Sequence, residues 1–588
     1  MNWGPADAGR LFADAQRAFA AGDGAGAVHL LDQLPAAVRN DGQVLHFRAL
    51  ALRKAGRSDD AQTAFDRARK IAPNDPEITN NHANLLMQIG KADEALALYD
   101  SALAIRPDYP DARFNRALAL QALGRQDEAL VALDAIVVAN PGEERAHSAR
   151  GTILLALDHY DAAAEAFDRS LASGKQLLTA QHGRARIALQ RGEADASRRF
   201  GQLRTRLPDN AEILLAMAEA LEAEGDPAGI AMLADALRTR PDWISGLERL
   251  AQMRAETGEA DFASHYDPAL RQSSDQASLR LSLAKMLAGA DRYTEALDAI
   301  APLPDDAQLS VLRAYYLGEA GDPRAGLALL ENRLDGEAYM IGGRLALACG
   351  DYDRALALLD QSIAAQPDSI AAWAHCELAW RFTGDPRADW LSGQDGLVAI
   401  RQLGLCASEI AAIVDCLRET HRTRSHPIGQ SLRGGTQTRG RLFCRMEPEI
   451  RMLHQAVEAI VASHIAAFPA TDVRHPLLKH RDSAFALAGS WSVRLLASGF
   501  HVQHIHPEGL ISSACYLLLP PSVADQNARS GWLELGRPPA SLNLTLEPIR
   551  LIQPEIGCLA LFPSYLFHGT RPFRDGERVT VAFDVVTV

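Results

Sequence analysis

A repeat of 34 residues runs through the first part of the chain and constrains its fold more than any other feature. Residues of one type recur at this step in four interlocked series. The series are the glycines Gly22, Gly56, Gly90, Gly124 and Gly192, the alanines Ala27, Ala61, Ala95, Ala129 and Ala163, the aspartates Asp32, Asp66, Asp100, Asp134 and Asp168, and the prolines Pro73, Pro107 and Pro141. Self-similarity at a fixed step of this length is the signature of a stacked repeat array.

The residue types at these positions predict two amphipathic helices in each unit. The glycine ends the first helix by adopting a left-handed conformation, and the proline stops the second helix. The small alanine lets the two helices approach closely, and the bulky apolar residue before each aspartate packs on the next pair. Stacked pairs of this kind form a superhelix with a concave groove.

This pattern is similar to the tetratricopeptide repeat. It is strong over residues 22–175, becomes degenerate over 200–340, and returns at Gly350 and Gly384. We therefore expect a tetratricopeptide-repeat superhelix of about eleven helical pairs over residues 8–385. The resemblance implies that the groove holds a protein or peptide segment; a role in oligomerisation or spacing alone stays open.

The pattern of apolar residues in the sequence changes after Gly384. Residues 386–490 still read mostly as helices, whereas residues 491–588 contain short apolar runs separated by glycine and proline. Such spacing is typical of the strands of a β-sandwich or barrel. We predict a second domain over 386–588, with a helical lead-in and a C-terminal β-core.

Three histidines in this β-core are candidates for a metal site. His504 and His506 are two residues apart, so on a strand both imidazoles point to the same face. His568 follows a later apolar run, and Arg578 lies ten residues beyond it. A lone histidine in a β-core is usually just hydrogen-bonded, but this combination is much harder to explain by accident.

The order of these residues resembles that of the Fe(II)/2-oxoglutarate-dependent oxygenases of the prolyl-hydroxylase-like branch. The closer resemblance is to a bacterial group in which tetratricopeptide repeats precede an oxygenase domain. The motifs that carry it are His504-Ile505-His506-Pro507, Gly531-Trp532-Leu533 and Phe562-Pro563-Ser564. The resemblance implies a double-stranded β-helix (jelly-roll, cupin-like) domain with flanking helices, and Fe(II) and 2-oxoglutarate as cofactors, with ascorbate as a possible reductant.

The resemblance assigns the metal to His504, His506 and His568. In the family, two histidines and a carboxylate bind one face of the iron. Here His506 occupies the position of the usual aspartate, which gives the iron a higher net charge. Glu508 is the alternative carboxylate ligand, although Pro507-Glu508-Gly509 reads as a turn that directs it away.

Residues near the C-terminus are expected to bind 2-oxoglutarate. The family's arginine, here Arg578, binds the distal carboxylate bidentately, which a planar guanidinium does well. Thr580 lies on the same strand face and can add a hydroxyl bond. Tyr516 stands where this branch often places a tyrosine that reaches the same carboxylate; a role as an ordinary core residue stays open.

A glycine-containing polar segment before the β-core can form a substrate loop or lid. Arg433, Thr436 and Gln437 lie in or beside it. Arg494, on the first expected strand, and His501, near the mouth of the site, are further candidates for substrate contact. An ordinary surface loop is the open alternative for this segment.

The function that the resemblance implies is hydroxylation, by a 2-oxoglutarate-dependent dioxygenase, of a residue in a protein or peptide bound through the repeat groove. Two alternatives stay open. One is a non-catalytic repeat scaffold with a degenerate cupin-like domain, and the other is an oxygenase of a small-molecule substrate.

Composition and charge limit the classes of partner that this protein is expected to bind. The net charge of −14 and the pI of about 5.7 give no basic footprint for nucleic acid. No run of about 18 apolar residues predicts a membrane span, and the N-terminus does not read as a signal peptide. Seven cysteines without a CxxC pair suit a reduced compartment, so a cytoplasmic protein is expected.

Overall fold

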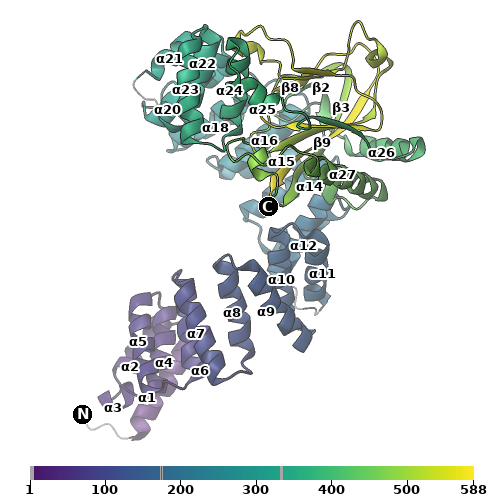
Figure 1. The fold of residues 1–588 in the computed structure, drawn as a ribbon. Coiled ribbons are helices and arrows are strands. Elements are labelled where there is room, and N and C mark those ends of the chain that lie inside the picture. The colour runs from purple at the N-terminus through teal and green to yellow at the C-terminus, as the bar shows by residue number, and fades with distance from the viewer. Residues whose placement is uncertain (1–4, 173, 175–176, 332–334) are drawn as a thin grey trace. The chain divides into compact units, whose positions relative to one another are not determined.

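The protein divides into two compact units. The structure, a computed structural model, describes residues 5–172, 174, 177–331 and 335–588. The units are Met1–Ile187 and Ala188–Val588. In Figure 1 the helices run from purple through teal to green, and the strands are green to yellow. The described part of the first unit is helical, whereas the second unit combines further helices with two antiparallel sheets.

Consecutive helices of the first unit pack in pairs, α4 with α5, α6 with α7, α8 with α9 and α10 with α11. The helices are α1 (Pro5–Ala20), α2 (Gly24–Asp32), α3 (Ala36–Arg39), α4 (Gly42–Lys54), α5 (Ser58–Ile71), α6 (Pro76–Gln88), α7 (Ala92–Ile105), α8 (Pro110–Ala122), α9 (Gln126–Ala139), α10 (Glu144–Ala156) and α11 (Tyr160–Ala172). Helix α12 (Leu178–Arg191) leads into the second unit.

The repeated glycines end the first helix of each pair, as the sequence predicts. Gly56 and Gly90 have φ angles of 75° and 80°, in the left-handed region that a Cβ disfavours. Asp158 stands where the series lacks its glycine, and it adopts a φ of 60° in the same role. Aspartate tolerates this conformation better than most side chains, so the repeat survives the substitution.

The repeated alanines and the bulky residues form the interior of the array. Ala27, Ala61, Ala95, Ala129 and Ala163 are all fully buried. Leu31, Phe65, Tyr99, Leu133 and Phe167 are at most 1% exposed. Close helix packing at the alanines and burial of the larger side chains between pairs therefore hold the array together.

The repeated aspartates form a ladder of ion pairs that the sequence analysis does not predict. Four of the five pair with an arginine 16 residues later, on a following helix, and Asp66 lies 3.9 Å from His82 at the same spacing. The pairs are Asp32–Arg48 at 3.1 Å, Asp100–Arg116 at 2.6 Å, Asp134–Arg150 at 2.6 Å and Asp168–Arg184 at 3.1 Å. The aspartates are half exposed, so each pair contributes at most about 1 kcal/mol.

Helical pairs continue through the region where the sequence pattern is degenerate. The helices are α13 (Ala196–Arg206), α14 (Ala211–Ala223), α15 (Ala228–Thr239), α16 (Ile244–Glu256), α17 (Tyr266–Gln272), α18 (Gln276–Gly289), α19 (Tyr293–Ile300), α20 (Ala307–Glu319), α21 (Pro323–Leu329), α22 (Gly336–Cys349), α23 (Tyr352–Ala365), α24 (Ile370–Thr383) and α25 (Arg387–Ser392). Helices α26 (Ala407–Thr420) and α27 (Pro448–Ala466) follow. Within the described ranges no helix is both long and apolar enough to cross a membrane.

Two antiparallel sheets make up the rest of the second unit. The strands are β1 (Ala399–Gln402), β2 (Leu432–Gln437), β3 (Phe485–His501), β4 (Ile511–Leu518), β5 (Leu533–Leu535), β6 (Arg550–Ile552), β7 (Cys558–Pro563), β8 (His568–Thr570) and β9 (Arg578–Thr587). The larger sheet has the order β1-β7-β4-β9-β3-β2, and the smaller one has the order β6-β5-β8. Short 3-10 turns lie at Leu442–Cys444, Leu478–His480, Pro521–Ala524 and Ala540–Leu542.

The lead-in to the β-core contains strands as well as helices. Strand β1 pairs with β7 at one edge of the larger sheet, and β2 pairs with β3 at the other edge. Strand β3 begins at Phe485, before the expected start of the core. Both edge strands are short and are fixed by partners far away in the sequence, so local alternation gives little sign of them.

Helices α20–α24 and the larger sheet share one hydrophobic core. Trp373 and Trp380 from α24 belong to the same buried cluster as Cys515 of β4, Leu561 of β7 and Val581 of β9. The last repeat helices are therefore packed directly against the sheet. A domain division at residue 385 stays a prediction.

A strap over residues 422–429 also ties the sheets to the repeat helices. The Arg422 guanidinium donates to the carbonyl of Ala223, the last residue of α14, at 3.0 Å. The backbone N–H of Ser425 donates to Glu256, which ends α16, and that of Gly429 donates to Gly289, which ends α18. The strap thus satisfies carbonyl groups that helix ends leave without intrahelical partners.

Candidate functional site

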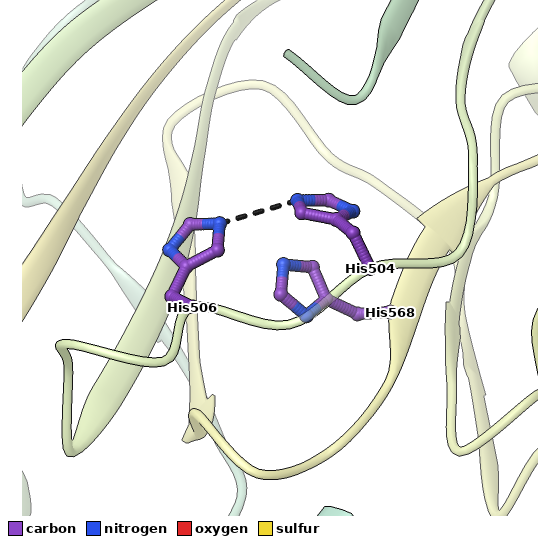
Figure 2. Close-up of side chains that lie close together, drawn as sticks. All are labelled: His504, His506 and His568. Atoms are coloured by element: carbon purple, nitrogen blue, oxygen red, sulfur yellow. Dashed lines mark hydrogen bonds between the residues drawn. The ribbon is translucent and has the colours of Figure 1, made fainter. Parts of the chain in front are cut away.

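Backbone pairing brings the three predicted histidines together. His568 opens β8 and lies opposite Leu535 of β5. On its other side it pairs with His504, through backbone hydrogen bonds of 2.9 and 3.0 Å in both directions. His506 follows two residues later, before a turn. Figure 2 shows the three imidazoles directed toward one another from these two segments.

The hydrogen bonds of the three rings fix which nitrogen faces the centre. Nδ1 of His504 donates to the carbonyl of Val502 at 2.9 Å, and Nδ1 of His568 donates to that of Leu566 at 3.1 Å. Because a carbonyl oxygen can only accept, the proton of each neutral ring lies on Nδ1. The Nε2 lone pairs are then free to bind a metal, as in metal-binding histidines generally.

The converging nitrogens form a concentrated set of electron-pair donors. His504 Nε2 and His506 Nε2 are 3.2 Å apart, and the candidate ligand atoms of all three rings lie within 4.8 Å of one another. Burial, together with the neighbouring imidazoles, lowers the pKa of His504 to about 3 and that of His568 well below 6.5. Both rings are therefore neutral near pH 7, and the cluster fits a divalent cation.

A carboxylate lies behind the cluster, at a position that the sequence analysis does not include. Asp584 Oδ1 accepts a hydrogen bond of 2.5 Å from His506 Nδ1. Asp584 lies on β9, six residues after Arg578 and four after Thr580. The three side chains therefore belong to the same face of the strand. The place of Asp584 on the strand was readable from the sequence, but its contact with His506 depends on the fold.

Arg578 is a buried cation without a carboxylate partner among the residues that the structure describes. It is 2% exposed, and one of its terminal nitrogens donates to the carbonyl of Gly531 at 3.0 Å. Its Nε is buried without a hydrogen bond, and burial lowers the pKa of the guanidinium. An anion in this pocket would supply the missing partner.

Two further predicted residues lie beside Arg578. Thr580 is 5% exposed and lies directly opposite Tyr516 in the pairing of β9 with β4. The guanidinium carbon of Arg578 is 5.2 Å from the centre of the Tyr516 ring. The Tyr516 hydroxyl is buried without a hydrogen-bond partner in the described chain, and burial raises its pKa to about 12. The hydroxyl is therefore protonated and available to donate.

A cavity of about 2060 Å³ connects the histidine cluster to the repeat helices. Arg578, Thr580 and Asp584 line it on the side of the larger sheet. Lys285 of α18, Tyr315 of α20, and Met340, Ile341 and Arg344 of α22 line it on the side of the repeats. The repeat helices of the second unit are thus a wall of the site itself, which the sequence analysis does not predict.

The remaining candidates divide between this cavity and other surroundings. Arg433, Gln437, His501 and Glu508 line the cavity. Arg433 is ion-paired with Asp291, His501 Nδ1 lies 3.0 Å from the hydroxyl of Ser431, and Glu508 is outside the histidine cluster. Thr436 and Arg494 do not line it: Thr436 bonds His421 at 2.8 Å, and Arg494 bonds Glu577 at 2.5 Å.

The glycine-containing polar segment, for which the sequence suggests a lid or surface loop, forms strand β2. Gly434 has a φ of 72° at a register shift in its pairing with β3. A Cβ on Gly435 would lie 2.3 Å from the carbonyl oxygen of Arg494, so glycine is what allows the two strands to approach. The glycines therefore serve a bulged edge strand rather than a hinge.

Ser431, which precedes β2, is a second residue that the sequence analysis missed. Its hydroxyl lies 3.1 Å from His504 Nε2 and 3.0 Å from His501 Nδ1. It can therefore donate to the metal-facing nitrogen of His504 when no cation is bound. Nothing in the local sequence marks this serine as part of the site.

Comparisons with known proteins match one segment of the repeats and one segment near the C-terminus. Residues 83–124 match a family described as "TPR repeat", and residues 489–584 match a family described as "Putative 2OG-Fe(II) oxygenase". A search of the curated proteins found no match.

Solved structures similar to the chain include tetratricopeptide-repeat proteins. One from Parabacteroides merdae is 21% identical, covers 41% of this chain and 97% of its own, and has a TM-score of 0.32. A thermophilic one from Thermus thermophilus is 25% identical, covers 31% of this chain and 98% of its own, and has a TM-score of 0.27. PilW, a type IV pilus biogenesis factor, is 21% identical, covers 35% and 96%, and has a TM-score of 0.32. The chain thus joins tetratricopeptide repeats to a segment that matches a 2-oxoglutarate- and iron(II)-dependent oxygenase family.

Proposed function

We propose that this protein is an iron(II)- and 2-oxoglutarate-dependent hydroxylase of a protein or peptide substrate. His504, His506 and His568 would hold the iron, and Arg578 would bind the distal carboxylate of 2-oxoglutarate. The observation that carries the proposal is the combination of three converging Nε2 atoms with a buried, uncompensated arginine in one cavity. The match of residues 489–584 to the oxygenase family supports it.

The ligand set suits iron. Imidazole is a good ligand for Fe(II), and three facial ligands leave positions open for a chelating 2-oxo acid and for oxygen. When bound, iron(II) and 2-oxoglutarate supply the oxidising power for C–H hydroxylation, with O2 consumed and succinate and CO2 released. The backbone acceptors of Val502 and Leu566 keep two of the rings in the tautomer that presents Nε2.

The pocket around Arg578 suits the far end of 2-oxoglutarate. A carboxylate there would accept charge-assisted hydrogen bonds from the guanidinium, including the Nε that has no partner in the described chain. Thr580 lies two residues from Arg578 on the same strand face, so its hydroxyl can add a bond. The Tyr516 hydroxyl is buried without a hydrogen bond in the described chain, which favours a donor role toward the ligand over a purely structural one.

The size and walls of the cavity favour a large substrate. Pockets for small molecules have volumes of about 300–1,000 Å³, whereas this cavity has about 2060 Å³. Helices α18, α20 and α22 form one wall, and tetratricopeptide repeats generally mediate protein–protein interactions. A polypeptide segment that enters along these helices and places one side chain at the histidine cluster fits both features.

The architecture proposed with this function is a double-stranded β-helix built from the larger and the smaller sheet. The larger sheet carries Arg578 and Asp584, the smaller one carries His568, and the His504–His568 pairing extends the smaller sheet toward His506. In functional terms we divide the chain into a repeat domain over 8–385 and an oxygenase domain over 386–588.

Anaerobic reconstitution of the full-length protein tests the proposal. Iron(II) and 2-oxoglutarate together should produce a metal-to-ligand charge-transfer band, and admission of oxygen should release succinate. His568→Ala should abolish the band, while Arg494→Ala, outside the cavity lining, should retain it. Absence of both the band and succinate in the wild-type protein would refute the proposed function.

A further inference from the structure

We propose that Asp584 is a positioning residue that supplies, through His506, the negative charge that an aspartate ligand would supply directly. The inference rests on the proposed function, because it concerns the same metal centre. It explains how this chain can depart from the oxygenase pattern, with a histidine at the position of the aspartate ligand.

The contact between the two side chains is short and sheltered. His506 Nδ1 and Asp584 Oδ1 are 2.5 Å apart, and the side chains are 14% and 16% exposed. A carboxylate can only accept this bond, so the proton lies on Nδ1 and Nε2 faces His504 at 3.2 Å. Asp584 therefore holds the His506 ring in the tautomer that a metal needs.

The larger sheet fixes the carboxylate in place. Asp584 lies opposite Ser512 in the pairing of β9 with β4, and the Ser512 hydroxyl is 3.3 Å from the same Oδ1. Ser512 is itself 2.9 Å from the hydroxyl of Ser564. A Cβ on Gly509 would lie 3.2 Å from the Asp584 side chain, so the turn after His506 is packed tightly against it.

Among the described residues, no basic side chain neutralises the charge of Asp584. In the described chain no lysine or arginine forms an ion pair with Asp584, and its remaining hydrogen bond comes from a neutral serine. By contrast Glu534, another buried carboxylate of this domain, is shared between Arg537 and Arg571. A carboxylate without a cationic neighbour polarises the imidazole that it contacts.

This arrangement restores the charge balance of the usual centre. Three neutral imidazoles leave the full double charge of iron(II), whereas two imidazoles and a carboxylate reduce it by one. A carboxylate hydrogen-bonded to a ligating histidine makes that histidine a more basic ligand, and loss of such a partner typically weakens metal binding about 10–100-fold. The carboxylate is thus still present, but it lies one imidazole ring farther from the iron than an aspartate ligand would.

The first test compares two carboxylate-to-amide substitutions. Asp584→Asn keeps the shape and an acceptor oxygen but removes the charge next to His506. Glu534→Gln makes the same change at a buried carboxylate that touches none of the three histidines. Anaerobic titration with iron(II) should show binding weakened about 10–100-fold in Asp584→Asn and unchanged in Glu534→Gln.

A spectroscopic measurement separates a charge effect from simple loss of structure. Removal of negative charge from His506 leaves iron poorer in electrons, so transfer of an electron from iron to 2-oxoglutarate needs more energy. The charge-transfer band of Asp584→Asn should therefore move to shorter wavelength at saturating iron and 2-oxoglutarate. A band at the wild-type wavelength with wild-type iron affinity would overturn the inference.

A double-mutant cycle separates a role of Asp584 through His506 from a general cost to the fold. His506→Asp places a carboxylate directly at the metal and removes the ring that Asp584 contacts. In that background Asp584→Asn should cost no iron affinity, because it acts only through His506. Equal losses in both backgrounds would show that Asp584 matters only for the fold.

These outcomes are distinct from failure of the proposed function. If the wild-type protein binds no iron, the metal centre itself is refuted. If the wild-type protein binds iron and 2-oxoglutarate, but the cycle is additive and the band does not move, only the role of Asp584 is refuted.

Discussion

Replacement of Arg578 by methionine should abolish tight binding of 2-oxoglutarate while leaving the fold intact. Arg578 donates one hydrogen bond to a protein carbonyl, and the rest of its buried guanidinium has no carboxylate to bind in the described chain. Two charge-assisted hydrogen bonds to a ligand carboxylate contribute about 1.5–3 kcal/mol each. We take the lower end, because the ligand carboxylate must give up its own hydrogen bonds to water when it enters the pocket. A loss of about 3 kcal/mol corresponds to an affinity about 150-fold weaker.

The same structure predicts a small effect on stability. Burial disfavours the charged form of Arg578, as the lowered pKa shows, and methionine removes that uncompensated charge while filling similar space. The hydrogen bond to Gly531 is lost in exchange, at a cost of about 1 kcal/mol. The free energy of unfolding of the ligand-free protein should therefore change by no more than about 1 kcal/mol.

The assay is an anaerobic titration of the iron-loaded protein with 2-oxoglutarate, followed through the charge-transfer band. Arg571→Met is the matched control, because Arg571 bonds Glu534 at 2.8 Å and does not line the cavity. It should bind 2-oxoglutarate as the wild type does. The reasoning is refuted if Arg578→Met binds 2-oxoglutarate within threefold of the wild type, or if the control loses affinity to the same degree.

Three further predictions concern the metal ligands, acid stability and the repeats. Glu508→Ala should retain iron binding and His506→Ala should lose it, in anaerobic iron titrations; the reverse would reassign the third ligand. Burial lowers the pKa of His421 to about 4 from an ordinary 6.5, so its stabilising contribution is full above pH 6.5 and is lost as the pH falls toward 4. Urea unfolding at pH 7 and pH 5 should show that His421→Gln removes about 2 kcal/mol of the acid-induced loss, and an unchanged loss would contradict this. In the first unit, Phe65→Ala should cost about 3–5 kcal/mol because Phe65 is fully buried. Arg116→Ala should cost under about 1 kcal/mol, and similar costs for the two would be the contradicting result.

The repeats could be predicted well because their determinants are local. A left-handed residue, a small residue and a bulky residue at fixed spacing specify a helical pair without knowledge of the rest of the chain. Even the missing glycine at Asp158 is replaced by a residue that can adopt the required φ of 60°. The basic partners of the repeated aspartates, such as Arg48 and Arg116, recur at the same step, so the ladder was present in the sequence but was not recognised.

The site could be predicted only in part. His504 and His506 are neighbours, and the order of His568 and Arg578 follows a known family pattern, so these residues were found. Asp584 was missed because its contact with His506 depends on the pairing of β9 with β4, which places it behind the ring.

The cavity walls were missed for the same kind of reason. Tyr315 and Arg344 line the cavity because helices α20–α24 share a core with the larger sheet. That packing joins segments more than a hundred residues apart, and no local pattern encodes it. The sequence predicts a loop at β2 because glycines that permit close strand approach look like hinge glycines in sequence.

The most direct test of the metal centre is anomalous X-ray diffraction at the iron edge, from crystals of the full-length protein grown anaerobically with iron(II) and 2-oxoglutarate. The account predicts one strong peak among the Nε2 atoms of His504, His506 and His568, with the distal carboxylate of 2-oxoglutarate on Arg578. Iron that is bound by Glu508 in place of His506, or that lies away from these histidines, would contradict the account.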